Sequence, residues 1–411
     1  MKGVTRWAVT GLVGAVLGGA LAAPGTPGGM IAYVTETSNH VKQFHEIRPD
    51  GTGHRVILTL PNPSGWPTLA FGPDGRELAF VSDHAQTRSL YQADLYTVQV
   101  DGKNLRRITN AFSPPTNGLK ASVTVDVRIA PPGPTEPANP TGPFFVYVEG
   151  APDSKTVLAS GKVRFDNVAV VPGHAPYIVV MSGTHRWIRP GSALVPGRVN
   201  DLSFIDVTGN GLHEFGARAP SWKADGGALL FGFGDCCLYR VAARPPAGTR
   251  GDTLVEGGIP PLVAYAPTRA KRDQFLYSAL ESNGVSVRLG SEGAPTGRAV
   301  LTVTKLMGLA WLPSGSGFVF VTDDTGPDSF TSVSSNIWEH DLASGKDRQI
   351  THFTQNFVYN LSVSPDGQQI AFEYGTDTDI DGIWLVDRDG SRLHRLVRDG
   401  LSPAWGVNVN P

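Results

Sequence analysis

One four-part segment pattern recurs along this chain and limits its fold more than any other feature. Its clearest copy is WPTLAFGPDGRELAFVSDHAQTRSLYQADLYTVQVDGKNLRRITN, residues 66–110. A short apolar run ends at the Pro-Asp-Gly triplet of 73–75, which is typical of a tight turn because Pro fixes one φ and Gly tolerates positive φ. Two strand-like runs follow, and the Asp-Gly pair at 101–102 marks a hairpin before the last run, which we expect as a strand at 105–109. The pattern predicts a four-stranded antiparallel unit.

Four further copies of this unit follow along the chain. They occupy residues 220–255, 260–303, 307–351 and 360–397. Spacings of 43, 46 and 52 residues separate the equivalent turn positions, which are Ala224, Pro267, Pro313 and Pro365. Repeats of about 40 to 50 residues with four strands each are typical of a β-propeller, whose blades bury their faces against one another.

The two ends of the chain complement one another. Residues 30–35, 44–48 and 55–60 match the second, third and fourth strands of a blade. Residues 401–405 match a first strand, with no further strands after it. The simplest interpretation is that the last strand closes the ring by joining the first blade, which removes exposed sheet edges. We therefore expect an all-β, six-bladed propeller.

Residues 1–23 have the composition of a secretory signal peptide. Lys2 and Arg6 form a charged head, and a short, Gly-containing apolar core with small residues at its end follows. This core favours a cleaved leader over a membrane anchor, with cleavage after Ala22 or Ala23. We expect a periplasmic or extracellular (secreted) protein that has no membrane span once the leader is removed.

The repeat resembles the TolB-type propeller repeat, also called PD40 or WD40-like. The shared pattern is an aromatic residue and Ser-Pro-Asp-Gly, then an apolar strand, then Asp-Leu-Tyr, Asp-Gly and Arg-Leu-Thr or close variants. The resemblance implies a propeller that binds protein partners at the cell envelope. That family carries an α/β domain before the propeller, whereas only a few residues separate this leader from the first blade. Membership of a Tol–Pal assembly therefore does not follow from the resemblance.

Composition agrees with a turn-rich β protein. The chain contains 49 Gly and 32 Pro and shows no long helical period. Its formal net charge is −2 and it has no long basic run, which argues against a nucleic-acid partner. The only cysteines, Cys236 and Cys237, are adjacent, so a mutual disulfide and two free thiols both remain open. The oligomeric state has no signature in the sequence.

The segment between the first full copy and the copy at 220–255 is too long for a simple connection. Its strand-like part, which we place at 120–207, includes a Pro-rich loop and the run GKVRFDNV at 161–168. With the Pro-Gly pair at 172–173 and Tyr177, this run resembles the carboxypeptidase-regulatory-like β-sandwich. The resemblance implies an accessory domain without catalytic residues, and the alternative is an irregular decoration of a blade. The expected order is a signal peptide at 1–23, blades one and two at 29–119, the inserted sandwich at 120–207, and blades three to six with the closing strand at 208–411.

One acidic loop has the opening spacing of a calcium-binding loop. Asp377, Asp379 and Asp381 alternate, as carboxylates do when they converge on a hard cation. The twelfth position, where that motif has a closing Glu, is Arg388. An ordinary polar loop between two strands is the alternative.

A second, shorter loop shows a related pattern. Asp206, Asn210 and Glu214 place oxygen ligands at the first, fifth and ninth positions, at the point where the insert rejoins the propeller. Thr208 at the third position departs from the motif, and a simple Gly-Asn turn explains the segment as well. Calcium is therefore the one cofactor that the sequence makes a candidate.

The chain shows no motif of a catalytic site. Its ten His residues form no ligand-spaced pair, and the Gly-x-Ser-x-Gly nucleophile motif is absent. We predict a non-catalytic scaffold that binds a protein or peptide. One alternative is a polysaccharide lyase or hydrolase, with His, Arg or carboxylate groups converging on the channel. The other is a cell-surface carbohydrate-binding protein with an exposed aromatic platform on the insert, built from Trp187, Phe144 or Tyr147.

Overall fold

The computed structural model describes residues 28–61, 67–110, 117–129, 142–183, 185–208, 216–233, 237–245, 251–256, 262–323, 334–376 and 379–407. Within these ranges every element is a strand except two single-turn 3-10 helices, η1 (Gln86–Arg88) and η2 (Arg269–Lys271). Neither is long and apolar enough to cross a membrane. The all-β prediction is therefore confirmed.

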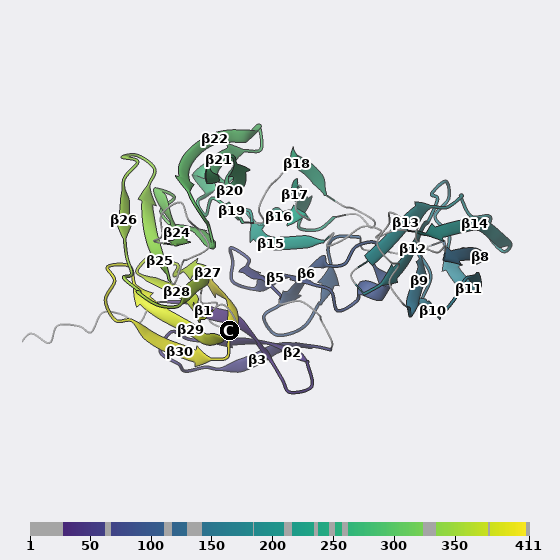
Figure 1. The fold of residues 1–411 in the computed structure, drawn as a ribbon, viewed down its shortest axis with the longest axis horizontal. Coiled ribbons are helices and arrows are strands. Elements are labelled where there is room, and N and C mark those ends of the chain that lie inside the picture. The colour runs from purple at the N-terminus through teal and green to yellow at the C-terminus, as the bar shows by residue number, and fades with distance from the viewer. Residues whose placement is uncertain are drawn as a thin grey trace, which may run out of the picture.

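Six four-stranded antiparallel sheets surround a central axis as the blades of a propeller (Figure 1). In five of them the strands follow one another outward from the axis in sequence order. Blade two contains β4 (Leu69–Phe71), β5 (Glu77–Ser82), β6 (Asp94–Gln99) and β7 (Arg106–Arg107). Blade three contains β15 (Ala217–Trp222), β16 (Ala228–Phe233), β17 (Cys237–Ala242) and β18 (Asp252–Glu256).

The next three blades follow without a large insertion. Blade four contains β19 (Val263–Tyr265), β20 (Gln274–Glu281), β21 (Gly284–Ser291) and β22 (Ala294–Val303). Blade five contains β23 (Gly308–Trp311), β24 (Gly317–Asp323), β25 (Ser335–Asp341) and β26 (Asp347–Gln349). Blade six contains β27 (Phe357–Val363), β28 (Gln369–Gly375), β29 (Ile380–Asp387) and β30 (His394–Arg398).

Blade one is assembled from both ends of the chain. Its outer strands are β1 (Met30–Glu36), β2 (Lys42–Ile47) and β3 (Arg55–Leu60), and its innermost strand is β31 (Leu401–Gly406). β31 pairs antiparallel with β1, and Ile31 lies opposite Trp405. The last strand therefore completes blade one, as expected from the sequence, and the ring has six blades.

The repeated turn triplets fold as their residue types require. In blade two the Asp74 Oδ1 atom accepts a hydrogen bond from the Arg76 amide at 3.0 Å, and Gly75 has a φ of 68°. Blade six repeats the arrangement, because Asp366 Oδ1 accepts from the Gln368 amide at 3.0 Å and Gly367 has a φ of 71°. Each triplet thus reverses the chain between the first two strands of its blade.

Apolar side chains between adjacent blades form the core of the ring. Between blades one and two they come from the middle strands of both sheets, namely Ala32, Val34, Phe44, Leu78, Phe80 and Tyr96. The Phe44 and Phe80 rings meet edge to face, with centroids 4.7 Å apart. A single blade could not bury these faces, and this is why the repeats fold only as a ring.

The described parts of residues 120–207 form two further sheets beside blades two and three (Figure 1). One sheet has the order β10-β9-β12-β13 and the other has the order β11-β8-β14. Their strands are β8 (Lys120–Ile129), β9 (Phe144–Val148), β10 (Lys155–Val157), β11 (Gly161–Ala169), β12 (Tyr177–Ser182), β13 (His185–Pro190) and β14 (Val199–Val207). Side chains from both sheets share one hydrophobic cluster. The relationship to the carboxypeptidase-regulatory-like sandwich stays a prediction.

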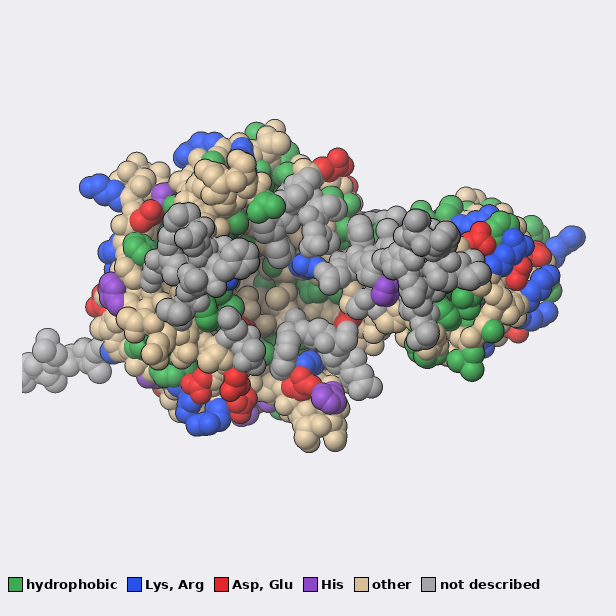
Figure 2. All heavy atoms as spheres, in the orientation of Figure 1, with side chains coloured by type: hydrophobic (Ala, Val, Ile, Leu, Met, Phe, Trp, Pro, Cys, Tyr) green, Lys and Arg blue, Asp and Glu red, His purple; other side chains and the backbone are tan. Residues whose placement is uncertain are grey.

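This inserted body rests against blade two. Leu90, from the loop after β5, is buried in the insert's own hydrophobic cluster. Arg186 on β13 is 1% exposed, and its Nη1 atom donates to the carbonyl oxygens of Gln86 at 3.4 Å and Ser89 at 3.3 Å. The insert is therefore tied to the propeller by apolar contacts and by a buried guanidinium. Lys and Arg side chains gather at its outer end (Figure 2).

Candidate functional site

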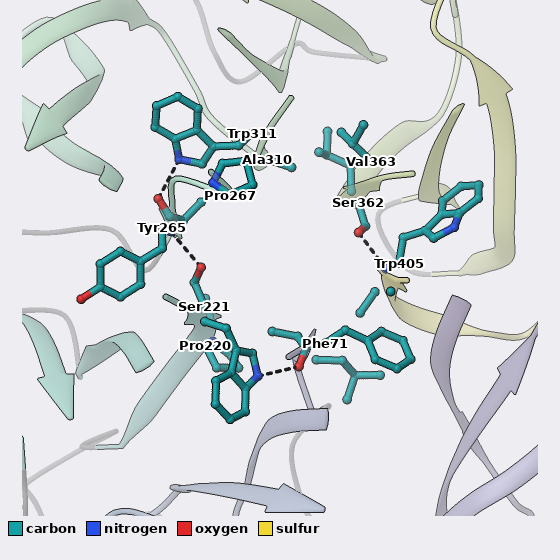
Figure 3. Close-up of a pocket in the computed structure, with 18 of the residues that line it drawn as sticks. Phe71, Pro220, Ser221, Tyr265, Pro267, Ala310, Trp311, Ser362, Val363 and Trp405 are labelled. Atoms are coloured by element: carbon teal, nitrogen blue, oxygen red, sulfur yellow. Dashed lines mark hydrogen bonds between the residues drawn. The ribbon is translucent and has the colours of Figure 1, made fainter. Parts of the chain in front are cut away.

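A central channel with a volume of about 510 Å³ runs along the propeller axis (Figure 3). Its walls are the innermost strands of the six blades, which are β4, β15, β19, β23, β27 and β31. Each of these is the edge strand of its sheet. An edge strand carries N–H and C=O groups that no strand of its own sheet binds, so those that are not bonded to another blade are available to a ligand in the channel.

Aromatic residues occupy the same position in five of the six innermost strands. They are Phe71, Trp222, Tyr265, Trp311 and Trp405, and Val363 takes this position in blade six. The labelled rings of Tyr265, Trp311 and Trp405 point away from the channel centre and between the blades (Figure 3). These rings hold the wall together and leave the strand backbones facing the channel.

Hydrogen bonds near the channel tie neighbouring blades together at four of the six junctions. Trp222 Nε1 donates to the Ala70 carbonyl at 3.1 Å, and Trp311 Nε1 donates to the Ala264 carbonyl at 2.9 Å. At two other junctions a serine Oγ accepts a backbone N–H at 2.8 Å, from Tyr265 to Ser221 and from Trp405 to Ser362. The indole rings and hydroxyls at these repeat positions therefore bond across blades.

Among the described residues that line the channel, none is a His, Lys, Arg, Asp or Glu. The only titratable side chain there is Tyr265, whose hydroxyl points outward and donates to Glu292 at 2.9 Å. Burial raises the pKa of this phenol, and the hydrogen bond to Glu292 adds to the effect. The lyase or hydrolase alternative needed several ionisable groups on the axis, and these wall residues do not supply them.

A buried carboxylate lies directly behind the channel wall. Glu373 on β28 is 5% exposed, and its Oε1 atom accepts hydrogen bonds from Asn360 Nδ2 at 2.9 Å and from the Ser402 amide. Both donors line the channel. Burial raises the pKa of this carboxyl, although the two hydrogen bonds oppose the shift.

The backbone is unusual at the same level of the channel. Ala219, Asn360 and Ser402 occupy equivalent positions in three innermost strands and have φ values of 43°, 27° and 55°. The pairing of each strand with its neighbour is interrupted at these residues, as in a β-bulge. Positive φ at non-glycine residues is a strained conformation that tends to occur at functional sites. Three strained residues therefore mark one mouth of the channel.

The structure brings no metal site together among the described residues. They contain no group of three or more His, Cys, Asp or Glu side chains placed to share an ion. Asp381 Oδ1 instead accepts a hydrogen bond from Arg395 at 2.6 Å. In the other loop, Asp206 is described, whereas Asn210 and Glu214 lie outside the described residues, as does Asp377. Calcium binding by these two loops stays a prediction.

The insert buries the residues proposed as a carbohydrate platform. Phe144, Tyr147 and Trp187 are at most 7% exposed and belong to the insert's core. Trp187 Nε1 donates to the Thr208 carbonyl at 2.9 Å. An aromatic platform would need these rings on the surface, so the carbohydrate-binding alternative loses its expected site.

Two histidines and one cysteine have distinctive surroundings. His45 and His340 are buried within blades one and five. His45 stacks against both Tyr33 and His54, and its burial lowers its pKa to about 4. Cys237 is disulfide-bonded, and the only other cysteine, Cys236, lies outside the described residues.

Comparison with known proteins supports the fold. No family model and no curated protein matches the chain. TolB from Acinetobacter baumannii is similar in structure, with a TM-score of 0.53 and 14% identity over 93% of this chain and 68% of that chain. A nidogen/laminin complex gives a TM-score of 0.49 and 8% identity over 92% of this chain and 99% of that chain. An oligogalacturonate lyase in complex with manganese gives a TM-score of 0.36 and 13% identity over 91% of this chain and 86% of that chain. Of these three structures, only TolB has a TM-score above 0.5. At 14% identity, this similarity shows that the chain shares the propeller fold and nothing more.

Proposed function

We propose that this chain is an exported propeller scaffold that binds an extended segment of a protein or peptide partner in its central channel. The observation that carries this proposal is the channel wall, which combines apolar side chains with the edges of six strands, whose backbone groups are only partly bonded to neighbouring blades. Apolar walls favour burial of hydrophobic side chains, and strand edges bind the main chain of an extended peptide. Among the described wall residues, none supplies an acid, a base or a metal ligand, so binding suits this site better than catalysis.

A place at the cell envelope is part of the proposal. The leader-like composition of residues 1–23 supports export, and the similarity to a TolB structure supports a propeller that acts as a scaffold. A rigid ring that presents many loops suits the recognition of a protein partner.

Narrowing the channel tests this function. Thr68 and Val407 line opposite ends of the cavity, and neither side chain is fully buried, so a larger residue can be accommodated there. Variants T68W and V407W serve as baits for affinity capture from envelope extract beside the wild-type protein. Leu280→Trp is the matched control, because Leu280 is 66% exposed and is absent from the channel wall.

We expect the wild type and L280W to capture the same specific protein, and T68W or V407W to capture at least tenfold less of it. Unchanged thermal unfolding of the variants would show that the ring is intact. Equal capture by all four baits would contradict the proposed function. A bait that lacks residues 120–207 should still capture the partner, and loss of capture with that bait alone would move recognition to the insert.

A further inference from the structure

We infer that Glu373 is the acidic end of a binding site for a primary ammonium group, at the channel mouth lined by Asn360 and Ser402. This inference rests on the proposed function, because the peptide held in the channel would carry the ammonium group. It adds to that function a chemical requirement on the ligand.

Glu373 is a buried carboxyl group without a neighbouring cation among the described residues. Its side chain is 5% exposed, and no described Lys, Arg or His forms an ion pair with it. Buried carboxylates are normally paired with a cation, because transfer of an isolated charge out of water is costly. A cation that arrives with a ligand would satisfy this requirement.

The fold does not need a carboxyl group at the position of Glu373. Strand register places five other residues at the equivalent position of the remaining blades: Val34, Val81, Gly232, Ser278 and Val321. None of these is ionisable. The structural task of Glu373, which is to accept two N–H bonds through Oε1, needs only a neutral carbonyl oxygen. An ionisable carboxyl group at this position, where an amide would suffice, therefore remains to be explained.

Glu373 lies next to the channel mouth. Both donors to Oε1, the Asn360 side chain and the Ser402 amide, belong to residues that line the channel. No described residue donates to Oε2, and this atom is not sealed from solvent. Glu373 itself does not line the channel, so an ammonium group must enter beside Asn360 and Ser402 to reach the free oxygen.

The chemistry of the ligand follows from this environment. An ammonium group donates three hydrogen bonds, and charge-assisted bonds to a carboxylate are stronger than neutral ones. An amino group on an apolar stem also fits a wall in which the described residues are mostly apolar. A peptide can present such a group from its N-terminus or from a lysine side chain.

Three short peptides distinguish these sources by isothermal titration. The first is Ala-Val-Ala-Leu amide with a free N-terminus, the second is acetyl-Ala-Val-Lys-Leu amide, and the third is the neutral acetyl-Ala-Val-Ala-Leu amide. We expect one charged peptide to bind the wild-type protein about tenfold more tightly than the neutral peptide, as a charge-assisted bond would produce. The tighter of the two identifies the source of the ammonium group.

Glu373→Gln keeps an oxygen that can accept from Asn360 and Ser402, and it should remove the preference for the charged peptide. Glu281→Gln is the control, since Glu281 belongs to the partly exposed end of β20 and is absent from the channel wall. In carbon-13 spectra the Glu373 carboxyl should move toward its ionised shift when the charged peptide binds. Equal binding of the three peptides would overturn the inference and leave a neutral peptide channel. Binding of none would also overturn it, while partner capture by the channel variants would still decide the proposed function.

Discussion

Two buried charges, Glu373 and Arg186, are held mainly by neutral hydrogen-bonding groups. Glu373 accepts from an amide side chain and a backbone N–H, and Arg186 donates to two backbone carbonyls. Burial raises the pKa of the Glu373 carboxyl and lowers that of Arg186 to about 10. Each charge therefore costs folding free energy, and each has an effect that a single substitution can measure.

Replacing Glu373 should change how stability depends on pH. Because its folded-state pKa is raised above the ordinary 4.5, the folded protein binds this proton more tightly than the unfolded chain does. Its contribution to stability is full below the unfolded pKa and is lost as pH rises through the folded pKa. Relative to wild type, E373Q should therefore become more stable as pH rises from about 4 to about 8. Urea unfolding across this range measures the difference, and a constant difference would contradict the assignment.

Replacing Arg186 should weaken the attachment of the insert. Arg186→Met leaves the Ser89 carbonyl without its side-chain donor, whereas the Gln86 carbonyl keeps its bond from the Ser89 amide; an unsatisfied buried group costs about 1–3 kcal/mol. We expect a loss of about 2 kcal/mol in the free energy of unfolding, together with faster amide exchange around residues 86–89. Lys162→Met on exposed β11 is the control and should stay within about 0.5 kcal/mol of wild type. Equal stability of R186M and K162M would rule out this role.

At the scale of elements, the closing strand β31 makes the ring continuous. It pairs with β1 in blade one, bonds Ser362 of blade six through the Trp405 amide, and ends against blade two. Gly406 is the contact point, because a Cβ atom there would lie 2.4 Å from Phe71 Cγ. No larger residue fits at position 406 unless the Phe71 side chain moves.

Gly406→Ala should therefore destabilise the closure between blades one and two. Overpacking of this kind costs about 1–3 kcal/mol. Gly293→Ala is the matched control, because no atom lies within 4 Å of its added Cβ and its backbone is not left-handed. Thermal and urea unfolding of both variants test the prediction. If G406A unfolds at the same denaturant concentration as G293A, the junction is not close-packed.

Most elements could be predicted from turn chemistry and spacing. The turn triplets follow the innermost strand of blades two, three, five and six, and the predicted strand at 55–60 coincides with β3. The fourth strand of blade two was predicted at 105–109, whereas β7 contains only Arg106–Arg107. The ladder ends there because the Leu95 amide donates to the Thr109 side-chain Oγ1 atom at 3.0 Å instead of to a backbone carbonyl. Local patterns cannot show such tertiary bonds.

For the whole molecule, the repeat predicted the ring, but the candidate site depends on contacts between blades. Glu373 lies in the ordinary strand sequence IAFEYG, and its only signal is that the aligned copies at this position, such as Val81 and Val321, are uncharged. The docking of the insert depends on Arg186 and Leu90, which lie far apart in the sequence. Neither the position of Glu373 at the channel mouth nor the docking of the insert on blade two can be predicted from the residue pattern, because both depend on tertiary contacts.

Photo-crosslinking in intact cells tests the central claim most directly. A photoreactive phenylalanine analogue would be placed in turn at Thr68 and Val407 in the channel, at Leu158 on the insert and at Leu280 on an outer strand. Leu158 and Leu280 are 80% and 66% exposed, so both can reach any partner that docks on the outside. We predict a crosslinked partner from one or both channel positions and none from Leu280. Crosslinks from Leu158 alone, or none from the channel, would contradict the claim that the channel is the binding site.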